Sequence, residues 1–190
     1  MRAFKFTGLH IHHKYYIKEQ KAWASENLNV HIFNNGDLIT EARNNTTWIN
    51  QCEKQQGCWC FYGNSKMNSI FGKIYNRYAL IAENNIIPEG WRLPSLGDFE
   101  ILETHLKNTY IDFPGDTLKS KKGWEMNNNG NNKSNFGAKP GGYRLYDGNF
   151  ENLGWGVWFW LLDGKFEITS GGYSSGTSHE HNGAYVRLIR

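Results

Sequence analysis

The sequence predicts a compact, loop-rich fold of short strands with few helices, and two observations support this prediction. The 190 residues include 21 glycines and repeated short runs of asparagine, which are the residue types that tolerate positive φ and form tight turns. The chain also carries 8 Trp, 10 Tyr and 11 Phe, and each such ring can bury about 150–250 Å² in a core. Because this length suits one domain, we expect a single domain over residues 1–190.

Short segments of strand or helix character are expected in the first half of the chain. In order, they are two strands in residues 3–19, a helical turn or irregular segment in 22–27, a strand in 27–33, a helix in 46–55, and a strand or a helix in 73–81. The Asn35-Gly36 pair is a strong turn signal that ends the strand of 27–33. Trp48 lies on the helix of 46–55, and periodicity alone does not decide residues 73–81.

A helix over residues 96–107 has the strongest local support. Ser95 and Asp98 fit an N-terminal capping box in form, with Asp in the place of the more common Glu. Phe99 and Leu102 then follow at helical spacing, which gives the segment an apolar side.

The second half of the chain divides into a polar stretch and a strand-rich end. Residues 108–142 carry few order signals and are expected to form a long surface loop, of the kind that is often functional in compact domains. Beyond Gly142, short apolar runs are separated by glycines. These runs are predicted strands, over residues 143–145, 157–162, 166–170 and 184–189.

The charge and hydropathy of the chain exclude two classes of partner. The net charge is +3, from 21 basic and 18 acidic residues, which is too mild to indicate nucleic-acid binding. No apolar run approaches the roughly 18 residues of a membrane span. No signal peptide is visible after Met1, and the location therefore stays open.

Three cysteines, Cys52, Cys58 and Cys60, lie close together in the sequence. A disulfide-dense scaffold would contain more cysteines. One bridge within residues 52–60 is possible and would leave an odd thiol. Since no histidine lies at a suitable spacing, we predict no zinc site there.

Histidines also suggest a metal site, but weakly. His10, His12 and His13 form one group, and His179 and His181 form another. Imidazole is a common ligand of zinc, copper and nickel, yet two histidines at i and i+2, such as His10 and His12 on one face of a strand, lack a placed third ligand. No calcium-loop motif is present either, so we predict no metal and no cofactor.

A series of short motifs carries a family resemblance. In chain order, the motifs lie at residues 23–30, 35–37, 72–79, 87–95, 124, 135–144 and 185–188. Their order and spacing resemble the Fibrobacter succinogenes major paralogous domain family over roughly residues 15–190. The stretch from Gly72 to Leu106, which includes GWRLPS at residues 90–95, is the clearest part.

This family is similar to the C-type-lectin-like superfamily, which also holds formylglycine-generating enzymes and the variable proteins of diversity-generating retroelements. The resemblance implies an α+β, C-type-lectin-like fold with short, mostly antiparallel strands. It also implies paired first and last strands, two flanking helices and long irregular loops that present a ligand. A secreted or cell-surface location is implied in the same way.

Two segments near the carboxyl end are candidates for ligand contact. On a strand, Trp158 and Trp160 share one face, which either packs in the core or offers a stacking surface to a sugar ring or an apolar partner. Residues 171–183 have the Tyr, Ser, Gly and Asn composition of adaptable binding loops, or else form a plain solvated hairpin. The resemblance favours as contacts Trp158, Trp160, Tyr173, Ser174, Thr177, His179 and His181.

The sequence therefore predicts a non-catalytic module that binds a protein or glycan partner through C-terminal loops and an aromatic strand. The alternative is a structural subunit of a surface or appendage complex, within an oligomer or larger assembly. An oxidase of the formylglycine-generating type would need working cysteines in the C-terminal part, and none follows Cys60. The Glu-Pro-Asn and Trp-Asn-Asp motifs of calcium-dependent sugar binding are also absent.

Overall fold

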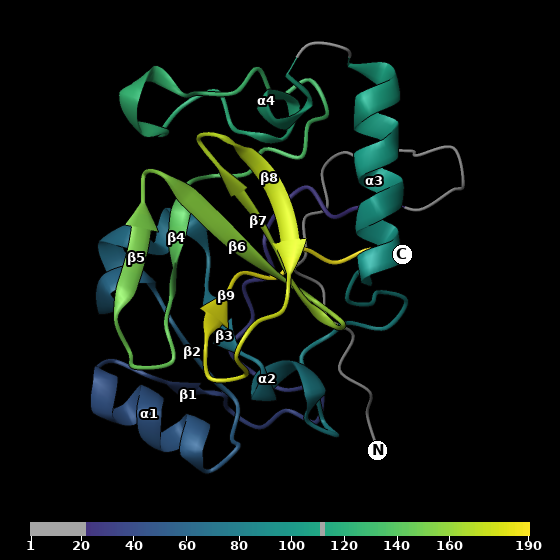
Figure 1. The fold of residues 1–190 in the computed structure, drawn as a ribbon. Coiled ribbons are helices and arrows are strands. Elements are labelled where there is room, and N and C mark those ends of the chain that lie inside the picture. The colour runs from purple at the N-terminus through teal and green to yellow at the C-terminus, as the bar shows by residue number, and fades with distance from the viewer. Residues whose placement is uncertain (1–21, 111–112) are drawn as a thin grey trace.

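The computed structural model describes residues 22–110 and 113–190 (Figure 1). The predicted strands of 3–19, with His10, His12 and His13, lie outside these ranges. The described elements are, in chain order, β1 (Thr40–Glu41), α1 (Asn45–Glu53), β2 (Cys58–Cys60), the 3₁₀ helices η1 (Tyr62–Asn64) and η2 (Lys66–Phe71), β3 (Ile74–Asn76), α2 (Tyr78–Ile81), α3 (Leu96–Thr109), α4 (Pro114–Leu118), η3 (Glu125–Asn127), β4 (Gly141–Arg144), β5 (Phe150–Leu153), β6 (Gly156–Leu161), β7 (Gly164–Thr169), β8 (Gly172–Gly176) and β9 (Gly183–Ala184).

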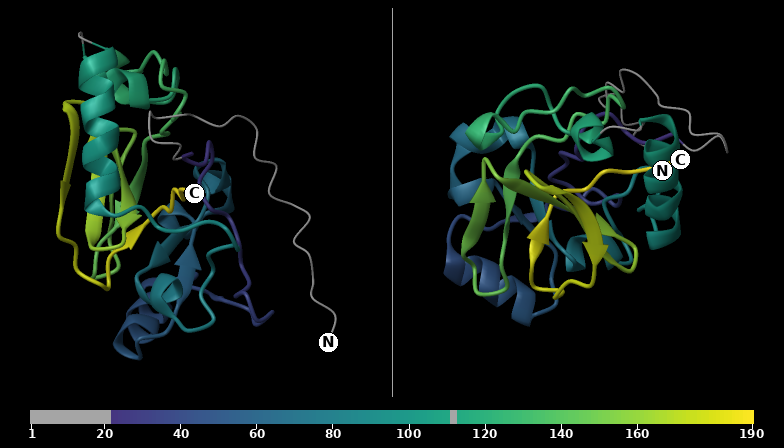
Figure 2. Two further views of the ribbon diagram at one scale, coloured as in Figure 1. Left: turned by 90° about the vertical axis from the view of Figure 1, so that its right-hand side faces the viewer. Right: turned by 45° about the horizontal axis from the view of Figure 1, so that its top comes forward.

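The strands join into one mixed sheet, so the expected α+β class is confirmed. Within the described residues the sheet has nine strands in the order β1-β2-β3-β9-β4-β6-β7-β8, and β5 pairs with β4. The β1–β2 and β4–β6 pairs are parallel, and the other pairs are antiparallel. The two longest helices lie at opposite ends of the molecule, α1 below β1 and β2 and α3 beside β6, β7 and β8 (Figures 1 and 2).

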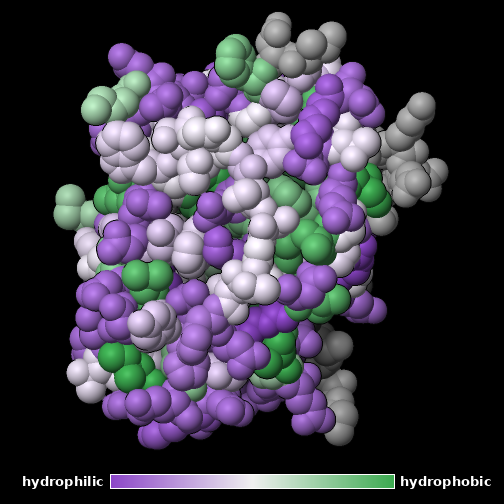
Figure 3. Space-filling model, in the orientation of Figure 1, coloured by the Kyte–Doolittle hydropathy of each residue, from purple (hydrophilic) through white to green (hydrophobic). Residues whose placement is uncertain are grey.

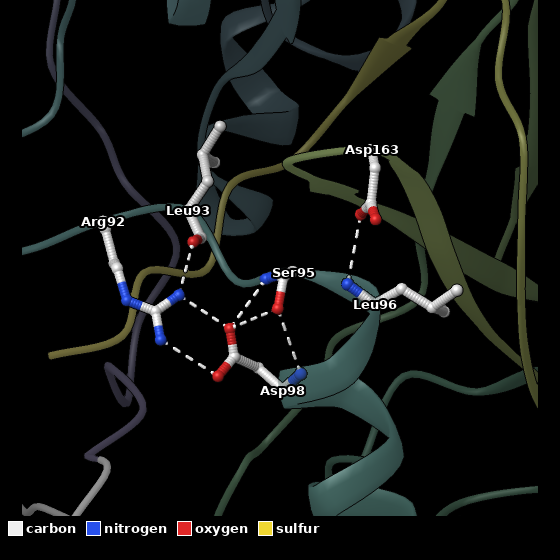
Figure 4. Close-up of polar contacts among 6 residues, drawn as sticks. All are labelled: Arg92, Leu93, Ser95, Leu96, Asp98 and Asp163. Atoms are coloured by element: carbon white, nitrogen blue, oxygen red, sulfur yellow. Dashed lines mark hydrogen bonds and ion pairs between the residues drawn. The ribbon is translucent and has the colours of Figure 1, made fainter.

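The α3 helix confirms the strongest local prediction. Ser95 Oγ accepts from the Asp98 N–H at 3.2 Å, and Asp98 Oδ2 accepts from the Ser95 N–H at 2.8 Å, which completes the capping box (Figure 4). The Arg92 guanidinium donates to both Asp98 carboxylate oxygens, at 2.6 and 3.0 Å. Asp163, in the turn after β6, accepts from the Leu96 N–H at 3.1 Å. The start of the helix is therefore fixed by its own cap and by the sheet.

Strand β6 lies between the two parts of the core. Val157, Phe159 and Leu161 belong to one buried cluster, where Phe159 stacks on Phe166 with ring centroids 4.8 Å apart. Trp160 belongs to a second buried cluster, and Trp158 packs against that cluster. The predicted alternation along this strand is confirmed, and the core has apolar material on both sides of it.

Residues 108–142 differ from the predicted surface loop. They contain α4, η3 and the start of β4, and they bury Leu118, Trp124 and Phe136. A backbone hydrogen bond of 2.8 Å from the Ala138 N–H to the Leu118 carbonyl joins the end of α4 to the stretch before β4. These apolar residues are too widely spaced to give a periodic signal, which is why the prediction of a long surface loop missed the short helices and the buried side chains of this segment.

The predicted strand of 27–33 is also wrong. In this segment only Ile32 forms a bridge, with Leu38, across the turn that the Asn-Gly pair correctly predicts. Near the start of the segment, the Leu28 N–H donates to the Val186 carbonyl at 2.8 Å. The segment changes partner along its length, so no neighbouring strand runs beside it long enough to form a ladder.

The predicted strand of 184–189 shortens to β9 for the same reason. Beyond β9, Tyr185 bridges to Phe159 on β6, and Ile189 bridges to Trp23. Successive residues are thus paired with different parts of the molecule. The segment remains extended and buried, as the apolar run indicates, but only Gly183 and Ala184 lie in a continuous ladder.

The two ends of the described fold lie side by side. The Ala22 N–H donates to the Arg190 carbonyl at 2.9 Å, and the Arg190 N–H donates to the Ala22 carbonyl at 3.1 Å. The Ala24 N–H donates to the Leu188 carbonyl at 2.8 Å. The first and last described segments are therefore antiparallel neighbours, joined by a short series of hydrogen bonds.

The three cysteines are free and buried. Burial raises the pKa of the Cys58 thiol well above its usual range and that of Cys60 to about 11. The hydrogen bond with Cys58 lowers the pKa of Cys52, against the effect of burial. The bridge that the spacing allowed is not formed, and the side chains of Cys58 and Cys60 serve as apolar residues of β2.

Candidate functional site

The seven predicted contact residues fall into separate parts of the structure. Trp158 and Ser174 lie on one face of the β6–β8 region, while Trp160 is 1% exposed and lies in the core. Tyr173, the neighbour of Ser174, points to the opposite side of β8. The remaining residues, Thr177, His179 and His181, lie on the segment that follows β8.

Trp158 and Ser174 are brought together by Glu167. Trp158 pairs with Glu167 across β6 and β7, and Glu167 pairs with Ser174 across β7 and β8, so the three form one row across the sheet. Trp158 Nε1 donates to Glu167 Oε2 at 2.7 Å, and Ser174 Oγ donates to Glu167 Oε1 at 3.2 Å. Lys165 Nζ contacts Glu167 Oε2 at 2.8 Å. We call these four residues, together with Tyr143, the Glu167 cluster.

The Trp158 indole is enclosed on both of its ring faces. Tyr143 stacks on it with ring centroids 3.5 Å apart and an interplanar angle of 6°. Lys165 Nζ lies 4.0 Å from the Trp158 ring centroid, and since Tyr143 covers one face, Lys165 must lie over the other. No face of this ring is therefore open to stack on a sugar, and Trp158 can offer a ligand only its edge.

Charge and burial compete at Glu167. Burial alone would raise the pKa of the Glu167 carboxyl, but the hydrogen bond and charge of Lys165, with hydrogen bonds from Trp158 and Ser174, lower it overall. Burial also raises the pKa of the Tyr143 hydroxyl. At neutral pH the cluster thus holds an ionised carboxylate, a neutral phenol and a lysine in fixed positions.

The lowered pKa gives the cluster a predicted pH dependence. Because the folded-state pKa of Glu167 is below its ordinary value, its contribution to stability is complete above that ordinary value and is lost as pH falls through the folded-state pKa. The Trp158 indole N–H resonance should therefore stay constant through the ordinary Glu titration range and shift only at lower pH. In Glu167→Gln that acid transition should be missing, while the exposed control Glu100→Gln on α3 should retain it. Identical acid titrations in wild type and Glu167→Gln would contradict the assignment.

Trp160 and Tyr173 are held in the interior packing. Trp160 Nε1 donates to the Tyr75 carbonyl at 2.8 Å, and the ring lies in the second core cluster. Tyr173 pairs with Ile168 across β7 and β8, and its ring meets Phe99 of α3 edge-on at 6.0 Å. Tyr173 is half-buried, so part of its side chain lies at the surface. Trp160 is buried, and we therefore do not include it in any proposed contact surface.

The segment after β8 is anchored through its backbone. The His181 carbonyl accepts from Trp48 Nε1 at 3.0 Å, and the His181 N–H donates to His179 Nδ1 at 3.1 Å. The His179 ring lies 5.3 Å from Tyr146, which is 57% exposed, and 4.8 Å from the His181 ring. Thr177 and His179 are exposed. This segment is therefore held in place by the core, while His179 is exposed beside the exposed Tyr146 of the turn between β4 and β5.

Metal binding finds no support in the part of the chain that the structure describes. No group of three or more His, Cys, Asp or Glu side chains is placed to hold an ion there.

The sequence analysis did not predict Tyr143, Lys165 and Glu167 as site residues, although Lys165 and Glu167 alternate with buried residues along β7. That alternation marks them as outward-facing, but their meeting with Tyr143 depends on strand pairing.

The fold is that of an α+β protein with a row of polar and aromatic side chains across part of a mixed sheet. The chain belongs to the Fibrobacter succinogenes major domain family, whose model matches residues 19–190. The resemblance drawn from the motifs is thus confirmed. No curated protein and no solved structure matches the chain. Across residues 22–110 and 113–190, no helix has the length and apolar character needed to span a bilayer.

Proposed function

We propose that this chain is a single-domain, non-catalytic binding module of the C-type-lectin-like fold, which recognises a protein or glycan partner. The proposed contact surface consists of the Glu167 cluster, strand β8 and residues 177–181. The observation that carries the proposal is the Glu167 cluster itself. A ligand that meets side chains already fixed in position costs little conformational entropy on binding.

Strand β8 adds an accessible edge to this surface. It is the last strand in the sheet order, and within the described residues it pairs only with β7. Gly115 of α4 approaches Gly172 so closely that an added Cβ would lie 3.3 Å from the Gly172 Cα, so α4 covers the start of the strand. Ser174, Ser175 and Gly176 are exposed, and β8 crosses this face as a pale band of near-neutral hydropathy in Figure 3. An uncovered edge with small side chains leaves backbone groups available to a partner.

A binding screen followed by one blocking substitution tests the proposal. A multimeric form of the full chain would be applied to glycan and protein arrays, and the dissociation constant of each hit would be measured by calorimetry. Ser174→Tyr places a ring beside Glu167 and should weaken binding at least about tenfold, which equals about 1.4 kcal/mol. The control Thr46→Tyr, exposed on α1 at the far end of the molecule, should leave affinity unchanged.

Two results would count against the proposal. One is the absence of any hit with the multimeric protein. The other is a hit whose affinity is equal in wild type and Ser174→Tyr, provided that both variants keep the thermal midpoint of the wild type.

The exposed β8 edge also favours a second function, as a structural subunit that pairs with a neighbouring copy or another subunit. In that case the mass measured by light scattering should rise with protein concentration, and Ser174→Tyr should reduce the rise. A strict monomer at high concentration would remove this alternative. An oxidase of the formylglycine-generating type receives no support from three buried thiols.

A further inference from the structure

A polar cleft lies away from the Glu167 cluster and is built from four separate parts of the chain. Its volume is about 320 Å³, and its walls come from residues 25–27 with Asn29, residues 69–72, Gly137 with Lys139, and Arg187. Each of these parts overlaps or adjoins one of the short motifs by which the chain resembles its family. None of the cleft residues belongs to the Glu167 cluster or to β8, so the cleft is a distinct feature.

Arg187 places a buried positive charge in the cleft wall. Its side chain is almost fully enclosed, with the residue 2% exposed. Nε and Nη2 donate to Asn27 Oδ1 at 3.1 and 2.8 Å, and Nη1 donates to the carbonyls of Ala24 and Phe136 at 3.1 and 2.6 Å. All of these acceptors are neutral. Burial lowers the pKa of Arg187 to about 9, so the guanidinium still carries its charge at neutral pH.

Two lysines add to this positive charge. Lys139 is exposed at the cleft and donates from Nζ to the Ile70 carbonyl at 2.8 Å. Lys73 is buried behind the wall and donates from Nζ to Asn29 Oδ1 at 2.7 Å. Among the described residues, no carboxylate forms an ion pair with Arg187, Lys139 or Lys73. The one acidic residue of the cleft wall is Glu26, which is exposed.

This balance of charge favours an anion. Two cations, Lys139 and Arg187, line the cleft against one carboxylate, Glu26, and a concave site with walls of low dielectric concentrates the resulting field. Ser25, Ser69 and Asn29 supply hydroxyl and amide groups beside the charges. The volume is at the lower end of the range for small-molecule pockets, which suits a ligand the size of one sugar or one amino acid.

We propose that this cleft binds a small organic carboxylate. Lys139 and the field of Arg187 attract the carboxylate, and the hydroxyl and amide groups of the wall bind the polar remainder of the ligand. The same carboxylate chemistry could come from a uronic acid or from an acylated amino acid. The proposal is independent of the binding face described above, because it uses different residues.

Calorimetric titration of the full chain with matched pairs of ligands tests this proposal. The acidic probes are glucuronate and N-acetylalanine, and their neutral counterparts are glucose and N-acetylalanine amide. At least one acid should bind about tenfold more tightly than its neutral counterpart, with an affinity that falls as salt is added. The acid that binds identifies the source of the carboxylate, and amide shifts at Gly72 and Gly137 should locate it in the cleft.

Surface substitutions separate the charges of the cleft from its shape. Lys139→Gln should weaken binding of the acid at least about fivefold, and Glu26→Gln should strengthen it, because each removes one charge of known sign from the cleft. Lys121→Gln, an exposed lysine outside the cleft, is the matched control and should have no effect. Equal binding of acids and neutral counterparts, binding of inorganic phosphate but of neither acid, or no effect of Lys139→Gln would overturn the proposal.

Discussion

Replacement of Gly142 by alanine is expected to lower the free energy of unfolding by about 3 kcal/mol. Gly142 has φ +68°, a left-handed conformation that costs an L residue about 1–2 kcal/mol. A Cβ there would lie 2.5 Å from Tyr62 Cε2 and even closer to the Glu151 carbonyl oxygen, which belongs to the backbone of β5 and cannot turn away. Gly142 also pairs with Val157, which joins β4 to β6, so the strain falls at the centre of the sheet.

Urea denaturation of the Gly142→Ala variant would measure this loss. The matched control is Gly176→Ala, because a Cβ at Gly176 meets no atom within 4 Å. The control should stay within about 0.5 kcal/mol of the wild type, as surface substitutions usually do. Equal stability of the two variants would show that the β4 backbone can move away from β5, contrary to the structure.

Arg144→Met is the second substitution with a large expected effect, a loss of about 3 kcal/mol. Arg144 is 0% exposed, and its guanidinium lies 4.5 Å from the ring centroids of both Trp48 and Phe150. It donates to the Gly148 carbonyl at 3.1 Å and to Asn45 Oδ1 at 2.9 Å. Methionine fills similar space but satisfies neither oxygen, and it removes both cation–π contacts. The guanidinium thus links the start of α1 to the turn between β4 and β5.

Thermal and urea unfolding of three variants would test this role of Arg144. Arg144→Lys keeps the positive charge but replaces the planar set of guanidinium N–H donors with a single ammonium group. The stability of this variant should therefore fall between those of the wild type and Arg144→Met. Arg43→Met removes an exposed arginine whose ion pair with Glu41 lies at the surface, and it should change stability by less than about 1 kcal/mol. If Arg144→Met were as stable as Arg43→Met, the buried guanidinium would not be a structural link.

The elements that the sequence predicts well are those with local causes. The α3 helix has its cap in Ser95 and Asp98 and its apolar side in Phe99 and Leu102, all within a few residues. The helix that carries Trp48 and the alternating strand β6 are similar cases. Residues 73–81, which periodicity left open, form β3 followed by α2, so both patterns were present in one short run.

The elements that the sequence does not predict depend on distant partners. Cys58 and Cys60 invite a disulfide or metal interpretation, yet they are buried residues of β2 between β1 and β3. For strand β8 the sequence left a binding loop and a hairpin open, and the structure forms the hairpin because β7 supplies a ladder over the whole length of β8. Its serines and glycines have little strand preference of their own.

The candidate site shows the same division between local and distant causes. Trp158 and Ser174 were predicted as contacts from composition and family resemblance, and the structure places both beside Glu167. The row requires a particular register of three strands, and Tyr143 joins it from β4. No local pattern in the sequence fixes that register, so the enclosure of the Trp158 ring could not be foreseen.

The side-by-side ends of the fold determine how it would respond to tension. Ala22 and Arg190 exchange two backbone hydrogen bonds at one end of an antiparallel pair. A force that pulls these residues in opposite directions loads the bonds one after another, as in a zip, and does not load them all together in shear. The pair would therefore open first at Ala22 and Arg190, while two backbone hydrogen bonds between Arg92 and Ile189 still hold the last segment to the loop before α3.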